Sequence, residues 1–195
     1  MKALDILRFP DPRLRQKGKK VIQITPELKT LGEKMLQTMY AEKGVGLAAI
    51  QVGQPVRLIV VDTRPLSDEN ESRYDNSTLK SELEKGIKQP LILFNPEIVE
   101  KKGQVVFSEG CLSFPSYFAE VKRAETITLT ALNLHNQEMS LTTDGLLSIC
   151  LQHEVDHLDG KLFIDYLSPV KAARLREDIK KHGYPEGARA DSRNL

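Results

Sequence analysis

One helical segment constrains the fold more than any other part of the chain. Residues 146–158 are mostly apolar before the pattern His-Glu-x-x-His, which begins at His153. Thr-Asp-Gly at 143–145 suits a helix start, and Gly160 suits the helix end. A helix with so little polar surface has to be covered by other elements. We therefore expect a core built around this helix, with strands on the sides of it.

The two histidines of this helix are four residues apart. Residues i and i+4 share a helix face, so the imidazoles of His153 and His157 can reach one metal ion. Glu154 would then lie beside a water at that ion and could act as a general base. Asp156 and Asp159 are candidate hydrogen-bond partners of a ligand imidazole, or else surface charges. The competing interpretation is an incidental histidine pair on a solvated helix.

Other elements follow from periodicity and from turn residues. Thr25 and Pro26 suit a helix start, and leucines and methionines then recur at helical spacing. Runs rich in β-branched residues predict strands. The predicted helices are 25–43, 146–158 and about 169–181, and the predicted strands are 56–61, 91–95, 104–108 and 127–134.

The order of these elements indicates an α+β protein, because strands and helices do not alternate regularly. We expect a single domain over residues 1–182, with antiparallel or mixed β-sheets around the central metal-binding helix and a C-terminal helix. Residues 64–89 are rich in Asp, Glu, Asn, Ser and Lys, which predicts a polar surface insertion with one short helix at 77–86. Residues 183–195 are expected to form a mobile polar tail.

Composition excludes several classes of function. The net charge of +1 and the absence of Trp give no basis for binding nucleic acid or an acidic membrane surface. No apolar stretch is long enough to span a membrane, and Asp5, Arg8 and Pro10 interrupt any signal peptide. The two cysteines, Cys111 and Cys150, are expected to be free thiols in a reducing cytoplasm.

A catalytic metal site usually has three protein ligands and one open position. The identity of the third ligand distinguishes the possible classes of metal-dependent hydrolase. One protease class has a histidine six residues after the second His, but that residue here is Phe163. A second class has a glutamate about twenty residues downstream, and Glu177 lies there, although in a charged helix typical of a solvated face. Cys111 is the other candidate, since a thiolate is a strong ligand of first-row metals, but it could also be a small buried core residue.

Three segments taken together resemble the signature segments of peptide deformylases. They are Gly-Val-Gly-Leu-Ala-Ala-Ile-Gln at 44–51, Glu-Gly-Cys-Leu-Ser at 109–113, and Gln-His-Glu-Val-Asp-His-Leu-Asp-Gly at 152–160. Their order and separations match those of the family, and the resemblance runs from about residue 4 to residue 180. It implies an enzyme that removes the formyl group from the formylmethionine at the start of new polypeptides, releasing formate.

The resemblance implies roles for individual residues. Cys111, His153 and His157 would be the metal ligands, and Glu154 would transfer the proton. The side-chain amide of Gln51 and the backbone N–H of Leu112 would stabilise the oxyanion. An apolar pocket would hold the methionine side chain, although Phe107 and Leu146 could also be plain core residues. The residues implied for substrate binding are Val45, Gly46, Phe107, Glu109, Gly110, Leu146, Ile149 and Cys150.

The resemblance also implies one divalent ion, Fe²⁺ above all, with Zn²⁺, Ni²⁺ or Co²⁺ able to replace it. The partners would be the nascent formyl-Met polypeptide and the ribosome near its exit tunnel, in the cytoplasm. Phe118 departs from the family pattern, because a well-studied branch carries Arg there. Two alternatives remain at this stage: a zinc endopeptidase that uses Glu177, and a non-catalytic metal-binding domain.

The third ligand gives the first testable prediction. If Cys111 is a ligand, Cys111→Ala should lower metal affinity steeply, and Glu177→Ala should change little because it removes an exposed charge. The Co²⁺-substituted protein should show a sulfur-to-metal charge-transfer band in the near ultraviolet. That band should disappear in Cys111→Ala and persist in Glu177→Ala. A fully cobalt-loaded, reduced wild-type protein without this band would rule out the thiolate ligand.

Overall fold

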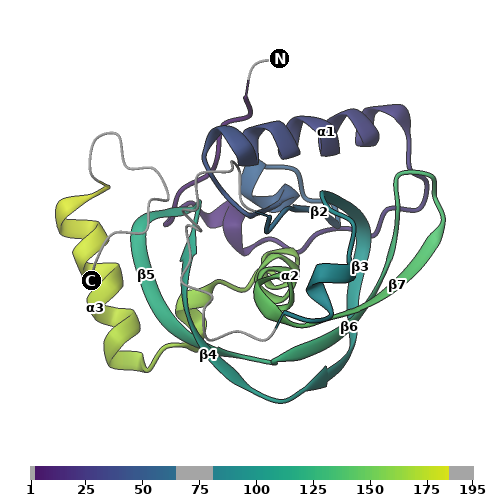
Figure 1. The fold of residues 1–195 in the computed structure, drawn as a ribbon. Coiled ribbons are helices and arrows are strands. Elements are labelled where there is room, and N and C mark those ends of the chain that lie inside the picture. Colours follow the sequence, from purple (N-terminus) through teal and green to yellow (C-terminus); the bar gives the residue numbers. More distant parts are fainter. Residues whose placement is uncertain (1–2, 65–80, 185–195) are drawn as a thin grey trace.

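A helix at the centre of the molecule organises the fold. The computed structural model describes residues 3–64 and 81–184. Helix α2 (Gly145–Leu158) lies in the middle, with strands on both sides of it (Figure 1). Every one of its residues is buried. The predicted central helix is therefore confirmed, with its end at the predicted residue.

A five-stranded sheet covers one side of α2. Its strand order is β1 (Gly46–Ala48), β2 (Leu58–Val61), β3 (Leu91–Lys102), β6 (Thr126–Leu132) and β7 (Glu138–Thr143), and every neighbouring pair is antiparallel. Alternate side chains such as Ile59, Leu93 and Leu129 form one hydrophobic core with Leu147 and Leu151 of α2.

Helix α1 (Pro26–Ala41) covers the other face of this sheet (Figure 1). The side chain of Thr25 accepts a hydrogen bond from the Leu28 N–H, which caps the helix start as predicted. Met35 and Met39 are fully buried against β2 residues such as Leu58. Strand β2 is therefore buried on both faces, which explains why its sequence is a continuous apolar run.

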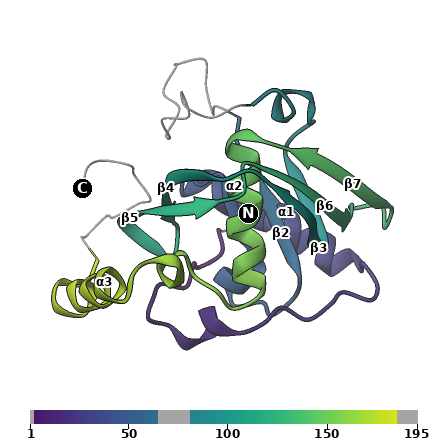
Figure 2. The same cartoon turned by 90° about the horizontal axis from the view of Figure 1, so that it is seen from below.

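The opposite side of α2 is covered by a two-stranded sheet of β4 (Val105–Cys111) and β5 (Phe114–Arg123). Figure 2 shows this hairpin beside the length of α2, with α3 (Pro169–His182) beyond it. Short 3-10 helices complete the structure: η1 (Pro12–Arg15), η2 (Ala49–Val52), η3 (Glu84–Gly86) and η4 (Phe163–Tyr166). In the described part of the chain, no helix has the length and apolar character that crossing a membrane requires.

The α+β fold is confirmed, but three of the strands were not predicted: β1, β5 and β7. Of the predicted surface insertion, residues 65–80 lie outside the described part. Of the short helix expected at 77–86, residues 77–80 also lie outside the described part, and residues 84–86 form η3. The expected mobile tail is described only at Gly183 and Tyr184, and the Tyr184 hydroxyl donates a hydrogen bond to the Phe9 carbonyl. Residues 185–195 lie outside the described part. Both cysteines are free and buried.

Candidate metal centre

Three donor atoms converge between β4 and α2. Cys111 ends β4, and His153 and His157 lie one turn apart on α2. The Cys111 Sγ is 3.3 Å from the His157 Nε2, which is 3.2 Å from the His153 Nε2. All three ligand atoms lie within 4.8 Å of one another, and all three residues are buried. A thiolate with two imidazoles suits a divalent first-row metal.

The electrostatics of this cluster favour a positive charge at the same point. Burial alone would lower the pKa of His153, but hydrogen bonds to Cys111 and Glu109 raise it well above its ordinary value. Burial, together with the neighbouring His153, lowers the pKa of His157 well below its ordinary value, so this imidazole is neutral. A positive charge is therefore favoured on the His153 imidazole, beside Cys111 and Glu109. The residues present fit a divalent ion.

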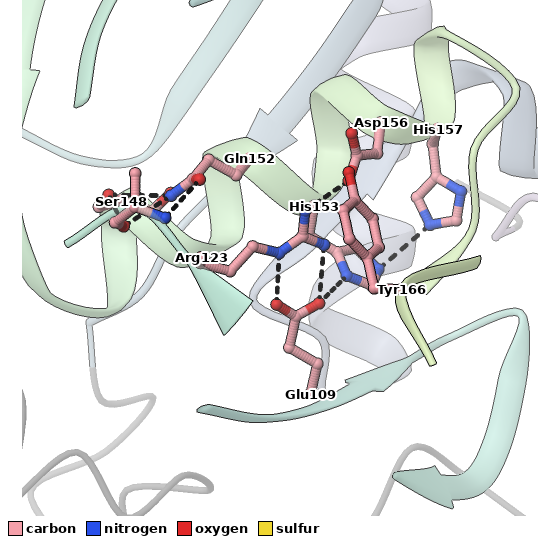
Figure 3. Close-up of polar contacts among 9 residues, drawn as sticks. Glu109, Arg123, Ser148, Gln152, His153, Asp156, His157 and Tyr166 are labelled. Carbon is pink, nitrogen blue, oxygen red and sulfur yellow. Dashed lines mark hydrogen bonds and ion pairs between the residues drawn. The ribbon is translucent and has the colours of Figure 1, made fainter. Parts of the chain in front are cut away.

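The orientation of His153 is fixed by Glu109. The Glu109 carboxylate accepts a hydrogen bond of 2.8 Å from the His153 Nδ1, which turns Nε2 toward His157 (Figure 3). Arg123 donates two further bonds to Glu109, of 2.6 and 2.9 Å. Burial would raise the pKa of Glu109, but the bonds from Arg123 and His153 outweigh burial and lower it to about 2. Glu109 is thus an anion at neutral pH and a strong acceptor.

Of the two interpretations of Asp156 and Asp159, the surface charge holds for Asp159, and neither residue has a hydrogen bond to a ligand imidazole among the described residues. Asp156 accepts a hydrogen bond from Arg123, and Asp159 pairs with Arg57. The helix spacing that suggested them does not decide where these carboxylates point. A sequence signal for the true partner existed in Glu109, two residues before a candidate ligand.

Glu154 combines burial with an unused oxygen. Its side chain is buried, and its Oε2 has no hydrogen-bond partner among the described residues. Burial raises the pKa of Glu154 to about 7, with His153 opposing and Glu109 adding to the shift. A carboxyl group with this pKa can both accept and return a proton near neutrality.

The Gln51 amide is held in one orientation beside the cluster. Its Oε1 accepts a hydrogen bond of 2.8 Å from the Ala48 N–H. Its Nε2 then donates to the Ser113 Oγ at 3.1 Å and lies 3.5 Å from the Cys111 Sγ. Ser113, which is fully buried, was not among the predicted site residues. Its place in the Glu-Gly-Cys-Leu-Ser segment was the available signal.

A cavity opens at the cluster. It is bordered by Glu154, Gln51 and Leu112, and by every residue that the sequence predicted for substrate binding. Gly44 also lines it and was not predicted to do so. The remaining lining residues are Val45, Gly46, Phe107, Glu109, Gly110, Cys111, Leu146, Ile149, Cys150 and His153.

The alternative third ligand lies elsewhere. Glu177 is on α3, is 64% exposed and forms an ion pair of 2.8 Å with Lys181. It is not in the cluster with the histidines. Phe118 lies on β5 opposite Gly110, where its ring occupies the space that a side chain at Gly110 would need.

Known proteins resemble this chain over most of its length. The sequence pattern of the polypeptide deformylase family matches residues 3–173. The peptide deformylase of Tolumonas auensis is 46% identical over 181 residues, which cover 93% of this chain and 96% of that protein. The Legionella pneumophila peptide deformylase structure has 40% identity and a TM-score of 0.76, covering 92% of this chain and 95% of that one. A structure from Ehrlichia chaffeensis in complex with actinonin has 35% identity and a TM-score of 0.79, covering 93% and 98%.

The close approach of β1 to α2 gives a prediction about Gly46. A Cβ there would lie 2.6 Å from the Cys150 Sγ and 2.9 Å from the Glu154 Cδ. Because all three positions are buried, Gly46→Ala should lower the free energy of unfolding by about 1–3 kcal/mol, as overpacking does. Gly86→Ala is the matched control, because no atom lies within 4 Å of its added Cβ. Urea denaturation measures both. A Gly46→Ala protein as stable as the control would contradict this packing.

Proposed function

We propose, from the premise that this chain belongs to the polypeptide deformylase family, that Cys111, His153 and His157 hold its metal and that Glu154 transfers the proton. The chain is an enzyme that removes the formyl group from formyl-Met polypeptides by metal-dependent hydrolysis, releasing formate. One observation carries the assignment of residues. Cys111, His153 and Glu154 line one cavity, and the His157 Nε2 lies within 3.3 Å of the other two ligand atoms. The Glu154 Oε2 has no hydrogen-bond partner among the described residues.

An amide is a poor electrophile, and its amine is a poor leaving group. A divalent ion, when bound, lowers the pKa of water toward about 7 and polarises a carbonyl. Glu154 takes a proton from the attacking water and gives it to the departing amine. Its pKa of about 7, raised by burial, suits both steps. Its burial also keeps bulk water from exchanging that proton.

Negative charge develops on the formyl oxygen as water adds. The Gln51 Nε2 and the backbone N–H of Leu112 would donate to this oxyanion, and one such donor is worth about 3 kcal/mol in the barrier. The bond from the Ala48 N–H holds the Gln51 Oε1, so the amide cannot turn its oxygen toward the substrate. Ser113 holds the donor end in place until the oxyanion forms.

Apolar side chains of the cavity would bind the methionine side chain of the substrate. Val45, Phe107, Leu146, Ile149 and Cys150 supply this surface. The formyl carbon carries only hydrogen beside its oxygen and nitrogen. A tight site can therefore admit a formyl group and exclude larger acyl groups. The other lining residues assigned to substrate binding are Gly46, Glu109 and Gly110.

Residues 1–182 would form the catalytic domain, with the insertion at 64–89 on its surface and a polar tail at 183–195. The substrate is the nascent formyl-Met polypeptide. Because such chains emerge from the ribosome, the enzyme would work near the exit tunnel, in the cytoplasm. Co-sedimentation with ribosomes tests this location, and a protein that stays entirely in the supernatant at low salt would contradict it.

The role of Glu154 can be separated from metal binding. Glu154→Gln keeps the shape of the side chain but removes the base, so metal content should stay near one ion per chain. Formate release from a formyl-Met peptide should fall by at least about 10²-fold. Glu177→Gln is the matched control and should release formate at the wild-type rate. A metal-loaded Glu154→Gln enzyme with near-normal turnover would show that another group transfers the proton.

The cluster and the family imply a single divalent metal, and we propose Fe²⁺ as its native identity. Iron with a thiolate ligand in an open site is sensitive to oxygen and peroxide. Protein prepared without oxygen and loaded with Fe²⁺ should be the most active form, and it should lose activity in air. The Ni²⁺ form should keep its activity there. Equal activity and equal stability in air for the Fe²⁺ and Zn²⁺ forms would argue against iron.

A further inference from the structure

Arg123 connects the two elements that carry the metal ligands. Its guanidinium binds Glu109, two residues before Cys111 on β4. It also donates a bond of 2.5 Å to Asp156, the residue before His157 on α2. Arg123 is only 5% exposed. The separation of β4 from α2 at the cluster is therefore set by one buried cation between two carboxylates.

Tyr166 covers Arg123 on the solvent side. It ends η4, and its ring lies over Arg123, with the guanidinium carbon 4.6 Å from the ring centroid. Its hydroxyl donates a hydrogen bond of 2.8 Å to the same Asp156 oxygen that accepts from Arg123 (Figure 3). Tyr166 is 45% exposed, so its ring separates the buried charges from bulk water.

The strength of the bonds from Arg123 to Glu109 and Asp156 depends on how well the Tyr166 ring separates these charges from bulk water. Charge pairs are much stronger in a dry environment than in water, and an aromatic ring over a desolvated cation adds to the attraction. Without the hydroxyl, Asp156 loses one of the two side-chain donors that the described residues give it. Without the ring, water reaches Arg123 and competes for Glu109. The bond from the His153 Nδ1 to Glu109 then loses its fixed partner, and partners of this kind tune metal affinity.

We propose that Tyr166 is a positioning residue of the metal centre. It acts through Asp156, Arg123 and Glu109 on the orientation of His153, and it thereby sets how long the ion stays bound. Tyr166 is neither in the ligand set nor among the residues that line the cavity. This inference rests on the ligand set proposed above.

The test compares matched tyrosines. Tyr166→Phe removes only the hydroxyl bond to Asp156, and Tyr166→Leu removes the ring as well. Tyr117→Phe is the control, because the half-buried Tyr117 hydroxyl makes an equivalent bond of 2.7 Å to Asp178 of α3, and neither residue belongs to the ligand set. The measurement is the rate of Zn²⁺ release from the loaded full-length protein to a chelator. We expect release to rise about threefold in Tyr166→Phe and about tenfold in Tyr166→Leu, toward the range typical of direct ligand partners.

A second readout follows His153 itself. The chain has four histidines, so the Nδ1–H proton of His153 in the Zn²⁺ form can be assigned by nuclear magnetic resonance. In Tyr166→Phe this resonance should shift and its exchange with water should accelerate, and in Tyr117→Phe it should not. A Tyr166→Phe protein that equals the Tyr117→Phe control in both readouts would overturn the proposal. Wild-type protein that fails to bind one Zn²⁺ would instead overturn the ligand set, and the inference with it.

Discussion

The complete burial of α2 is the constraint on which the rest of the structure depends. Six polar or charged side chains lie on this helix inside the protein, and a buried polar group without a partner is costly. Gln152 bonds the backbone of Ala124, Asp156 bonds Arg123, and His153 bonds Glu109. These partners come from β4, from β5 and from the residue that follows β5. The β4–β5 hairpin and the residue after it therefore supply hydrogen-bond partners to α2, whereas the five-stranded sheet packs apolar side chains against it. Among the described residues, two buried side-chain atoms keep no partner, the Glu154 Oε2 and the His157 Nδ1, and both belong to the proposed site.

The ion pairs of Arg123 with Glu109 and Asp156 are better explained by their effect on the orientation of His153 than by a contribution to the free energy of folding. Moving three charges out of water costs several kcal/mol for each ion, and their attraction only partly offsets this cost. An apolar cluster of similar volume would hold β4 against α2 equally well. It could not accept the Nδ1 proton of His153, however, and so could not choose which nitrogen faces the metal. The low pKa of Glu109 follows from the same bonds, which keep it an anion against the effect of burial.

The sequence predicted the elements whose neighbours are apolar. Strand β2 was found because both of its faces are buried, and α2 because its apolar residues surround a metal motif. Strand β7 was missed because Glu138, Ser140 and Thr142 point to solvent and leave a weak pattern. Strand β5 was missed because Pro115 and its charged residues look like a loop. In the site, short motifs marked the ligands and Glu154. Tyr166 was missed because its role depends on contacts between elements far apart in sequence, which no local pattern encodes. Ser113 was missed although it stands in the same short segment as Cys111.

The spacing of alternate side chains along β4 is close to the length of one turn of α2. This match explains why Glu109 and Cys111 lie opposite the two histidines of α2. Side chains two apart on a strand face the same way. The buried residues of β4 are Phe107, Glu109 and Cys111, and they keep this alternation although the pairing with β5 shifts its register between Gly110 and Cys111. Two strand residues span about 7 Å, and four helix residues span about 6 Å along the axis. Glu109 can therefore meet His153 while Cys111 meets His157, one turn further along. A residue added between Glu109 and Cys111 would turn one of them away from α2, because a shift of one reverses the face of a strand. The spacing in each motif is thus fixed by the geometry of the other.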